Sequence, residues 1–233
     1  MVDLVLDTAN ITSVASAGRQ DLTLTKPAGL SSGDLLLLVH ARSGGVGWGT
    51  VSTSLTAGTA AQTGDTSGHL LVRPYTRTVN GTEAGTYTWD ATSTGYRSGL
   101  GIGITGASTL KDTRSMASTL NGVGTGQSVS VGSAWSAHSG DQGVLVVAAT
   151  WDSVLTPPTG WTQQLKVEQA AGGTASHDLY VFSRTYASTG IDQPAVANTG
   201  SAASVVGLAW LFDGPTVPDP FVGHWHYRFD NIS

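Results

Sequence analysis

Few side chains in this 233-residue sequence combine the types and spacing that chemistry requires. His224 and His226 stand two residues apart, so on a strand both side chains would project from one face. Asp219 or Asp230 could then complete a metal site. Zinc needs three or four ligands in fixed geometry, however, and the remaining histidines are scattered along the chain. We therefore expect no metal and no other cofactor.

Two glycine motifs match the sequence patterns of enzyme sites but lack the secondary structure that those sites need around them. Residues 29–33 (GLSSG) fit the G-x-S-x-G pattern of a nucleophile elbow, but such an elbow follows a strand and opens a helix. Pro27 precedes this motif and a strand pattern follows it, which predicts an ordinary turn. Residues 101–106 (GIGITG) match the dinucleotide fingerprint, yet no helix pattern follows that could hold a pyrophosphate. Because the 16 acidic residues are spread through turns and strand ends, we expect no catalytic residues and no enzyme activity.

The composition indicates an all-β protein that binds no nucleic acid and does not insert into membranes. Glycine is abundant at 31 residues, only 12% of residues are charged, and helix-favouring residues are few. The net charge of −5 and the lack of any Lys or Arg run leave no basic surface for phosphates. The longest apolar runs are far too short to cross a bilayer. Cysteine is absent, which excludes disulfides and Cys-ligated zinc but does not fix a compartment. Residues 1–7 carry two acids where a secretory leader needs basic residues, so we expect synthesis in a cytoplasm.

Short apolar runs alternate with Gly, Pro, Asn and Ser, which is typical of strands joined by turns. The run at 35–39 is apolar on both faces and predicts a central strand, and residues 80–81 (Asn-Gly) predict a tight turn. Gly99, Gly101 and Gly103 share one face of another strand, which would let a backbone or an aromatic ring approach closely. The expected strands are residues 21–25, 35–39, 70–75, 86–89, 100–104, 128–131, 144–149, 163–167, 179–182 and 205–212.

The second half of the chain repeats the first in register. Gly-Asp precedes an apolar strand at 33–34 and again at 140–141, and Gly-Trp occurs at 47–48 and again at 160–161. This period is longer than the roughly 20 to 50 residues of solenoid and propeller units, so each repeat is expected to bury its own core. The strand pattern lapses around 106–125, where we place the boundary. We expect two tandem, duplicated, antiparallel β-sandwich domains of jelly-roll-like type, at 1–114 and 115–214, and a Pro-rich linker with a docking segment at 215–233.

The seven Trp residues are further candidates for function, because indole rings on loops can stack on sugars as well as fill cores. Trp48 and Trp161 occupy repeated positions, which favours a shared structural role. Trp210 alternates within a strand pattern, which favours the core. Trp135 and Trp151 are the candidates for exposed, glycan-stacking rings.

Residues 215–233 lie outside the repeat and contain three prolines followed by an aromatic stretch. Two interpretations stay open: the stretch adds an edge strand to its own domain, or it docks on a partner. The candidate docking residues are Phe221, His224, Trp225, His226, Tyr227 and Phe229.

At its repeated motifs the chain resembles a known family. The residues that carry the resemblance are KPAG at 26–29, GDLLL at 33–37, GD at 140–141 with VLV at 144–146, PPTGWT at 157–162 and LYVF at 179–182. They resemble a module in minor tail and other virion proteins of tailed bacteriophages, particularly those of actinobacteria, over roughly residues 15–214. The first half departs from the pattern at 45–49, where GVGWG stands in place of the fuller Pro-Thr-Gly-Trp-Thr form.

That resemblance implies a β-sandwich structural module of the virion, with no catalytic residues to carry over. We therefore expect a non-enzymatic minor tail protein that is located in the virion, is oligomeric in the particle and binds other tail or capsid subunits. A host-surface glycan is a further candidate partner. One alternative is a capsid decoration protein that stabilises the head. An alternative from another class is a carbohydrate-binding module that uses exposed Trp and Tyr rings.

Overall fold

The structure, a computed structural model, describes residues 11–16, 21–43, 63–64, 70–82, 85–90, 95–105, 109–118, 122–150, 153–168, 176–201 and 203–214. Within these ranges every regular element is a β-strand and every strand pairing is antiparallel, which confirms the expected all-β class. The strands in chain order are β1 (Ile11–Ser16), β2 (Leu22–Thr25), β3 (Leu35–Ser43), β4 (Thr63–Gly64), β5 (Leu70–Thr78), β6 (Thr86–Trp89), β7 (Tyr96–Ile104), β8 (Leu110–Ala117), β9 (Ser128–Ser130), β10 (Trp135–Ala137), β11 (Gln142–Thr150), β12 (Leu155–Thr156), β13 (Thr162–Val167), β14 (His177–Thr185), β15 (Gly190–Asp192), β16 (Ala195–Asn198) and β17 (Val205–Phe212).

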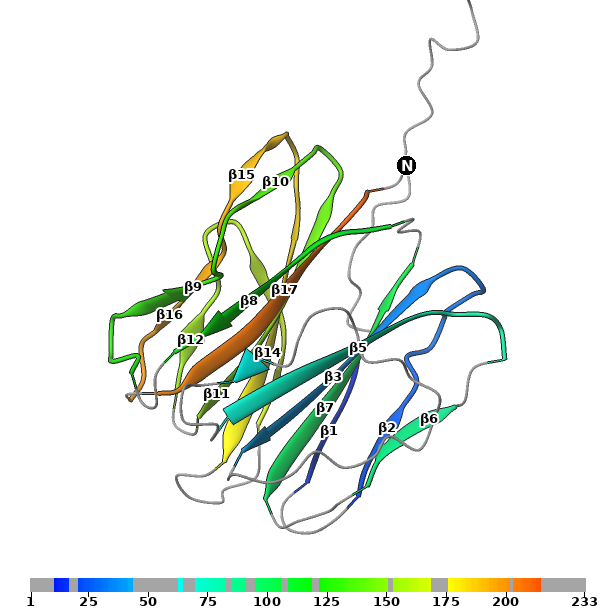
Figure 1. Ribbon diagram of the computed structural model, residues 1–233, viewed down its shortest axis with the longest axis horizontal. Helices are drawn as coiled ribbons and strands as arrows, with labels where there is room; N and C mark the ends of the chain where they lie inside the picture. Colours follow the sequence, from blue (N-terminus) through cyan, green and yellow to red (C-terminus); the bar gives the residue numbers. More distant parts are fainter. Residues whose placement is uncertain are drawn as a thin grey trace, which may run out of the picture.

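Two five-stranded sheets form the centre of the molecule (Figure 1). The first-half sheet has the strand order β1-β7-β3-β5-β4, and the second-half sheet has the order β13-β14-β11-β17-β8. Smaller sheets flank them: β2 with β6 packs on the first-half sheet, and β9-β16-β12 and β10 with β15 pack on the second-half sheet. The strands are therefore arranged in layers, with the two large sheets innermost.

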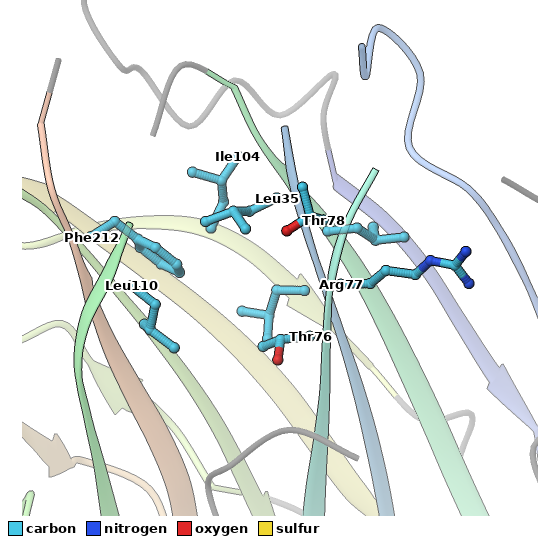
Figure 2. Close-up of a pocket in the computed structure, with 9 residues that line it drawn as sticks. Leu35, Thr76, Arg77, Thr78, Ile104, Leu110 and Phe212 are labelled. Atoms are coloured by element: carbon cyan, nitrogen blue, oxygen red, sulfur yellow. The ribbon is translucent and has the colours of Figure 1, made fainter. Parts of the chain in front are cut away.

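The two large sheets pack face to face through one apolar core, which we call the shared core. On β3, Leu37 and Val39 point into it, and every second residue of β11, β14 and β17 meets them from the other sheet. Figure 2 shows one end of this core, where Leu35 and Ile104 lie near Phe212. Each fully buried Leu or Val stabilises the folded state by about 1.5–3 kcal/mol, against a net stability of about 5–15 kcal/mol for a typical protein. Separating the sheets would therefore unfold the protein. The buried members are Leu37, Val39, Ala41, Leu70, Val72, Leu100, Ile102, Ile104, Val144, Val146, Ala148, Leu179, Val181, Val206, Leu208, Trp210 and Phe212.

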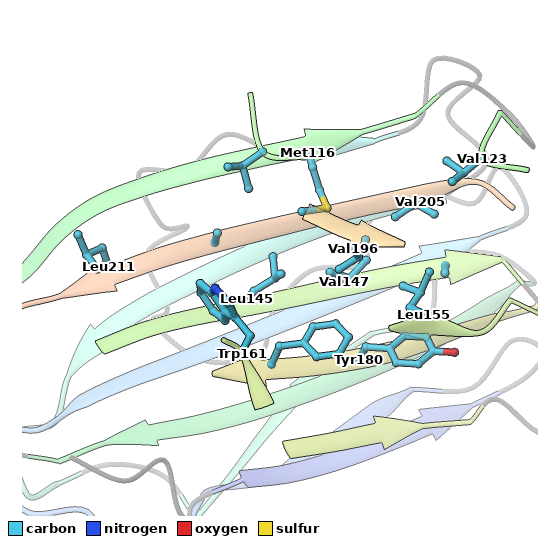
Figure 3. Close-up of a cluster of buried hydrophobic side chains, with 14 of the residues drawn as sticks. Met116, Val123, Leu145, Val147, Leu155, Trp161, Tyr180, Val196, Val205 and Leu211 are labelled. Carbon is cyan, nitrogen blue, oxygen red and sulfur yellow. The ribbon is translucent and has the colours of Figure 1, made fainter. Parts of the chain in front are cut away.

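The opposite face of each large sheet carries a further core, which we call an outer core. On β3, Leu36 and Leu38 face β2 and β6 and belong to the same cluster as Trp89. In the second half, Leu145 of β11 and Trp161 belong to the other outer core (Figure 3). A strand with a core on each face needs apolar side chains at successive positions, which explains the apolar runs at 35–39 in β3 and 143–149 in β11.

The predicted strands are all present, and several extend beyond the predicted ends. β2 alternates as expected, with its two leucines buried and its two threonines exposed. The turn at Asn80 and Gly81 also forms: Gly81 has a φ of 83°, and the Thr82 N–H donates to Asn80 Oδ1 at 3.0 Å. It does not close a hairpin, however, because β6 pairs with β2 and not with β5.

Residues 29–33 form the predicted turn before β3. Leu30 in this turn lies against the glycine face of β7 at Gly103, since a Cβ atom there would lie 2.6 Å from Leu30 Cδ2. The expected close approach to this face is therefore confirmed, but an aliphatic side chain makes it rather than a backbone or an aromatic ring.

The two Gly-Asp turns have the same hydrogen bonds. Gly33 and Gly140 both adopt a positive φ, 99° and 90°, which side chains other than glycine rarely permit. The carboxylates of Asp34 and Asp141 each accept a 2.7 Å hydrogen bond from the backbone N–H three residues earlier. Val79, which follows β5, exchanges two backbone hydrogen bonds with the first turn, both at 2.8 Å. Tyr186, which follows β14, exchanges two with the second turn, at 2.9 and 2.7 Å. Both aspartates therefore act as hydrogen-bond acceptors within their turns.

The central strands of the two halves also share their register. Leu35, the first residue of β3, pairs with the last residues of β5 and β7. Gln142, the first residue of β11, pairs with the last residues of β14 and β17. Three strands of each half thus have the same order and alignment, β5-β3-β7 and β14-β11-β17.

The boundary placed near residue 114 falls inside β8, which is the edge strand of the second-half sheet. The predicted lapse of the strand pattern is wrong at this point, because an edge strand open to solvent tolerates the charges of Lys111, Asp112 and Arg114. The shared core also joins the halves, so neither half buries all of its apolar surface by itself.

Candidate functional site

The described residues include few of the side chains that the sequence singled out for function. Trp135 lies in β10 and is only 3% exposed, so the prediction of an exposed, glycan-stacking ring there is wrong. Trp161 is buried in the second outer core and Trp210 in the shared core, in line with the structural roles expected of them. Outside the described residues lie Trp48, Trp151 and the whole segment 215–233 with its six candidate docking residues.

Trp135 belongs to a group of polar and aromatic side chains around Asp192. Asp192 Oδ2 accepts hydrogen bonds from Tyr186 OH at 2.7 Å and from Arg184 Nη1 at 3.0 Å. A third donor to the same oxygen is Trp161 Nε1, at 3.1 Å. The Tyr186 hydroxyl accepts a hydrogen bond from Trp135 Nε1 at 3.0 Å, and the Arg184 guanidinium lies 4.6 Å from the centre of the Tyr186 ring. We call these five residues the Asp192 cluster.

Strand pairing and glycines position this cluster. β10 pairs with β15 so that Trp135 lies opposite Asp192. Gly143 leaves room for the indole of Trp161, since a Cβ atom there would lie 2.6 Å from Cη2 of the ring. The alternation of Trp135, a serine and a buried alanine along β10 is the signal in the sequence that could have revealed the burial of this ring.

The electrostatics of the Asp192 cluster suit a structural role. Burial, together with the hydrogen bond to Asp192, raises the pKa of Tyr186, so its hydroxyl stays protonated and remains a donor. Asp192 also forms an ion pair with Arg184. The single Oδ2 atom of Asp192 thus joins donors from Trp161, Arg184 and Tyr186. The cluster therefore ties β15 to the end of the second-half sheet.

A second polar group joins the two large sheets. His177, the first residue of β14, is fully buried, and its Nδ1 lies 2.9 Å from Ser43 Oγ. Its Nε2 lies 2.6 Å from Ser98 Oγ. Because the serines belong to β3 and β7, this histidine bridges the halves. Burial lowers the pKa of His177 to about 4, so the ring is neutral at pH 7.

Cationic side chains lie on the first-half sheet near this bridge. Burial is the main cause that lowers the pKa of His40 well below its usual value, and the charge of Arg97 is a second cause. The charges of Arg42 and Arg73 act in the same direction. Burial also lowers the pKa of Arg42 to about 10. The His40 ring lies 5.2 Å from the Trp89 ring in the first outer core. Positive charges in this region therefore oppose protonation of His40, whereas burial alone lowers the pKa of His177.

Lys111 ties the end of β17 to the Gly-Asp turn of the second half. Its Nζ lies 2.8 Å from Asp141 Oδ2 and 3.3 Å from Asp213 Oδ1. The Gly214 N–H donates to Asp141 Oδ1 at 3.3 Å. Burial alone would lower the pKa of Lys111, but its hydrogen bonds to the two aspartates outweigh that effect and raise it. The chain is therefore held against the second-half sheet up to Gly214.

A cavity of about 170 Å³ lies at the end of the shared core. A β-bulge helps to shape it, because the pairing of β8 with β17 shifts by one residue and places Leu110, rather than Lys111, opposite Phe212. The shift turns Leu110 onto the inward face of the sheet. The lining residues are Leu35, Leu36, Leu37, Thr76, Arg77, Thr78, Ile104, Leu110 and Phe212.

Within the described ranges, no three His, Asp or Glu side chains come together as metal ligands. Among the same residues there is no helix long and apolar enough to span a membrane. Comparisons with protein-family models, curated proteins and solved structures find no match. The described residues define an all-β protein built on two antiparallel sheets that pack face to face.

Proposed function

We propose that this protein is a non-enzymatic structural protein of a tailed-bacteriophage virion and that it serves as a minor tail protein. The observation that carries the proposal is the shared core, which supports the view of the two halves as one rigid building block. A virion component must keep its shape while neighbouring subunits bind to it, and close-packed cores have the low compressibility that this role needs. The resemblance at 26–37 and 157–162 supplies the phage context.

In this proposal the two halves are duplicates of one β-sandwich module. The matching hydrogen bonds of the two Gly-Asp turns support duplication, as do the matching order and register of three strands in each half. An all-β fold does not by itself require the two halves of a chain to share these hydrogen bonds, this strand order and this register. The duplicated module has since acquired a shared core in place of two fully separate ones.

Other virion subunits bind the segment 215–233, which also serves as the link to an oligomeric assembly in the particle. The fixed position of Gly214 supports this role, because the docking segment then starts from a defined point on the second-half sheet. The described edges of that sheet are poorly suited to pairing with another chain. β8 presents charged side chains and a bulge, and β13 carries Lys166 and a second bulge.

Electron microscopy of labelled particles tests the proposed location. An epitope inserted between Ser188 and Thr189 lies in an exposed connection, so it leaves the cores and the docking segment unchanged. We expect label at the tail, and particles with the untagged chain give the background. Label over the head would contradict the tail assignment in favour of capsid decoration, and purified particles without label would contradict both virion roles.

A chain ending at Gly214 tests the docking segment. We expect it to fold with an unchanged urea midpoint, because the shared core and the bond from Gly214 to Asp141 remain, but to be missing from particles. The matched control is the full chain with Val217→Ala, which keeps every candidate docking residue. Incorporation of the shortened chain at the normal copy number would show that attachment uses another surface.

A further inference from the structure

We propose that the cavity at the end of the shared core is a binding site for a single uncharged ring, of the size and polarity of phenol or toluene. This inference is independent of the virion role, since it rests on the walls, size and polarity of the cavity alone.

The walls of the cavity are apolar and come from both halves of the chain. Leu35 and Ile104 contribute from the first-half sheet, and Phe212 and Leu110 from the second-half sheet (Figure 2). Leu35 and Leu110 are only partly buried, so the cavity is open to solvent on one side. Apolar surface of this kind favours a ligand that leaves water at no electrostatic cost.

The polar side chains that face into the cavity carry hydroxyls, and Arg77, the charged residue in its lining, lies on the other face of β5. Thr76 and Thr78 alternate with Arg77 along β5, so the threonines share the inward face and the arginine does not. Figure 2 shows the Arg77 side chain extending away from Leu35 and Phe212. A ligand with a negative charge would therefore gain no partner inside, whereas a ring with a single hydroxyl can form a hydrogen bond with a threonine.

The volume limits the ligand to one ring. In another protein, an engineered cavity of about 150 Å³ lined by Leu, Ile and Phe binds benzene. The present cavity has a similar lining and a volume of about 170 Å³. Sites for larger organic ligands enclose about 300–1,000 Å³. The fit is therefore to a benzene-sized group with at most a small substituent.

The cavity is held open by its surroundings. The bulge that turns Leu110 inward leaves Lys111 outside, where the ion pairs with Asp141 and Asp213 hold it. Phe212 lies in a strand that is paired on both sides. Since these walls are positioned before a ligand arrives, little ordering opposes binding.

A titration with p-cresol, followed by methyl NMR of the full chain, tests the site directly. We expect saturable shifts of the Leu35, Ile104 and Leu110 methyl groups, with a dissociation constant of about 1 mM or tighter. The methyl groups of Leu145 and Val147, in the second outer core, should not move. Lack of saturable shifts at the cavity up to about 10 mM p-cresol would overturn the proposal.

A pair of matched variants checks the location. Leu110→Phe fills the cavity, so p-cresol affinity should fall at least about tenfold, which is about 1.4 kcal/mol. Leu165→Phe is the control, because Leu165 is also partly buried against the shared core and also lies next to a bulge, but it does not line the cavity. Unchanged affinity in Leu110→Phe would overturn the proposal. If that variant does not fold, the titration of the unmodified chain still decides.

A second probe identifies the source of the ring. N-acetyl-tyrosinamide carries the same phenol on a peptide-like backbone. Equal binding of this probe and p-cresol would support a site for an aromatic side chain of a polypeptide. Binding of p-cresol alone would support a site for a free small molecule.

Discussion

Acid should weaken the protein through the buried bridge at His177. The usual pKa of a histidine is 6.5, and burial lowers that of His177 to about 4. Between these two pH values the unfolded chain binds a proton that the folded protein does not. The free energy of unfolding therefore decreases by about 1.4 kcal/mol for each unit that the pH falls from 6.5 to 4, or about 3 kcal/mol in total. The contribution is fully present above pH 6.5 and is lost by about pH 4.

The local structure explains why the proton is excluded. Both ring nitrogens face serine hydroxyls, Ser43 and Ser98, and no carboxylate contributes to the shift at this histidine. Three cations, Arg97, Arg42 and Arg73, are among the groups that lower the pKa of the nearby His40. A proton on His177 would thus be a buried charge without compensation.

The assay is urea unfolding at a series of pH values from 7 to about 4, on the unmodified chain and on His177→Gln. Glutamine can hydrogen-bond to both serines but cannot bind a proton. We expect the pH slope of the variant to be shallower by about 1.4 kcal/mol per unit between pH 6.5 and 4. His138→Gln is the control, because His138 is exposed and does not lie between the sheets.

Equal slopes in the unmodified chain and in His177→Gln would refute the reasoning. If the variant does not fold, an NMR titration of the His177 ring in the unmodified chain gives the same answer. A measured pKa near 6.5 would mean that the ring is not excluded from water as the contacts with Ser43 and Ser98 imply.

Further substitutions have defined outcomes in the same urea assay. Gly207→Ala should destabilise by about 1–3 kcal/mol, because its Cβ would lie 2.9 Å from a backbone oxygen of β11, while Gly190→Ala, with open space around it, should not. Asp141→Ala should cost about 2 kcal/mol, because it loses both the turn hydrogen bond from His138 and the ion pair with Lys111. A loss below about 0.5 kcal/mol would contradict the importance of these two contacts. Asp192→Ala should cost about 2–3 kcal/mol, because three donors lose their common acceptor, and a loss below about 1 kcal/mol would contradict this account.

The strands could be predicted from local pattern, but the way they combine could not. The alternation of β2 reflects one buried and one exposed face, and the apolar runs of β3 and β11 reflect two buried faces. Both patterns follow from burial alone, whichever strands lie alongside, so they can be recognised in the sequence. β8 was missed because its charges resemble those of a loop, and only its position at a sheet edge makes them acceptable. The shared core was missed because an apolar face does not specify which other apolar face will cover it.

The polar sites depend on such long-range contacts even more. Asp34 and Asp141 act within their own turns, so their role could be predicted from a few adjacent residues. Trp135 is buried by Tyr186 and its neighbours, which are distant in sequence, and the sequence alone suggested an exposed ring. His177 shares a strand face with two apolar residues of the shared core, which is a usable signal of burial, but nothing local identifies its serine partners.

The shared core has a consequence for synthesis of the chain on the ribosome. The inward face of β3 and β7 is complete once Ile104 has been made, but the strand that brings Phe212 against it is finished about a hundred residues later. At an elongation rate of up to about 20 residues per second, that delay is at least about five seconds. During this interval the nascent first half exposes Leu37, Val39 and their neighbours to solvent. Newly made chains should therefore bind chaperones until the second half emerges and covers them.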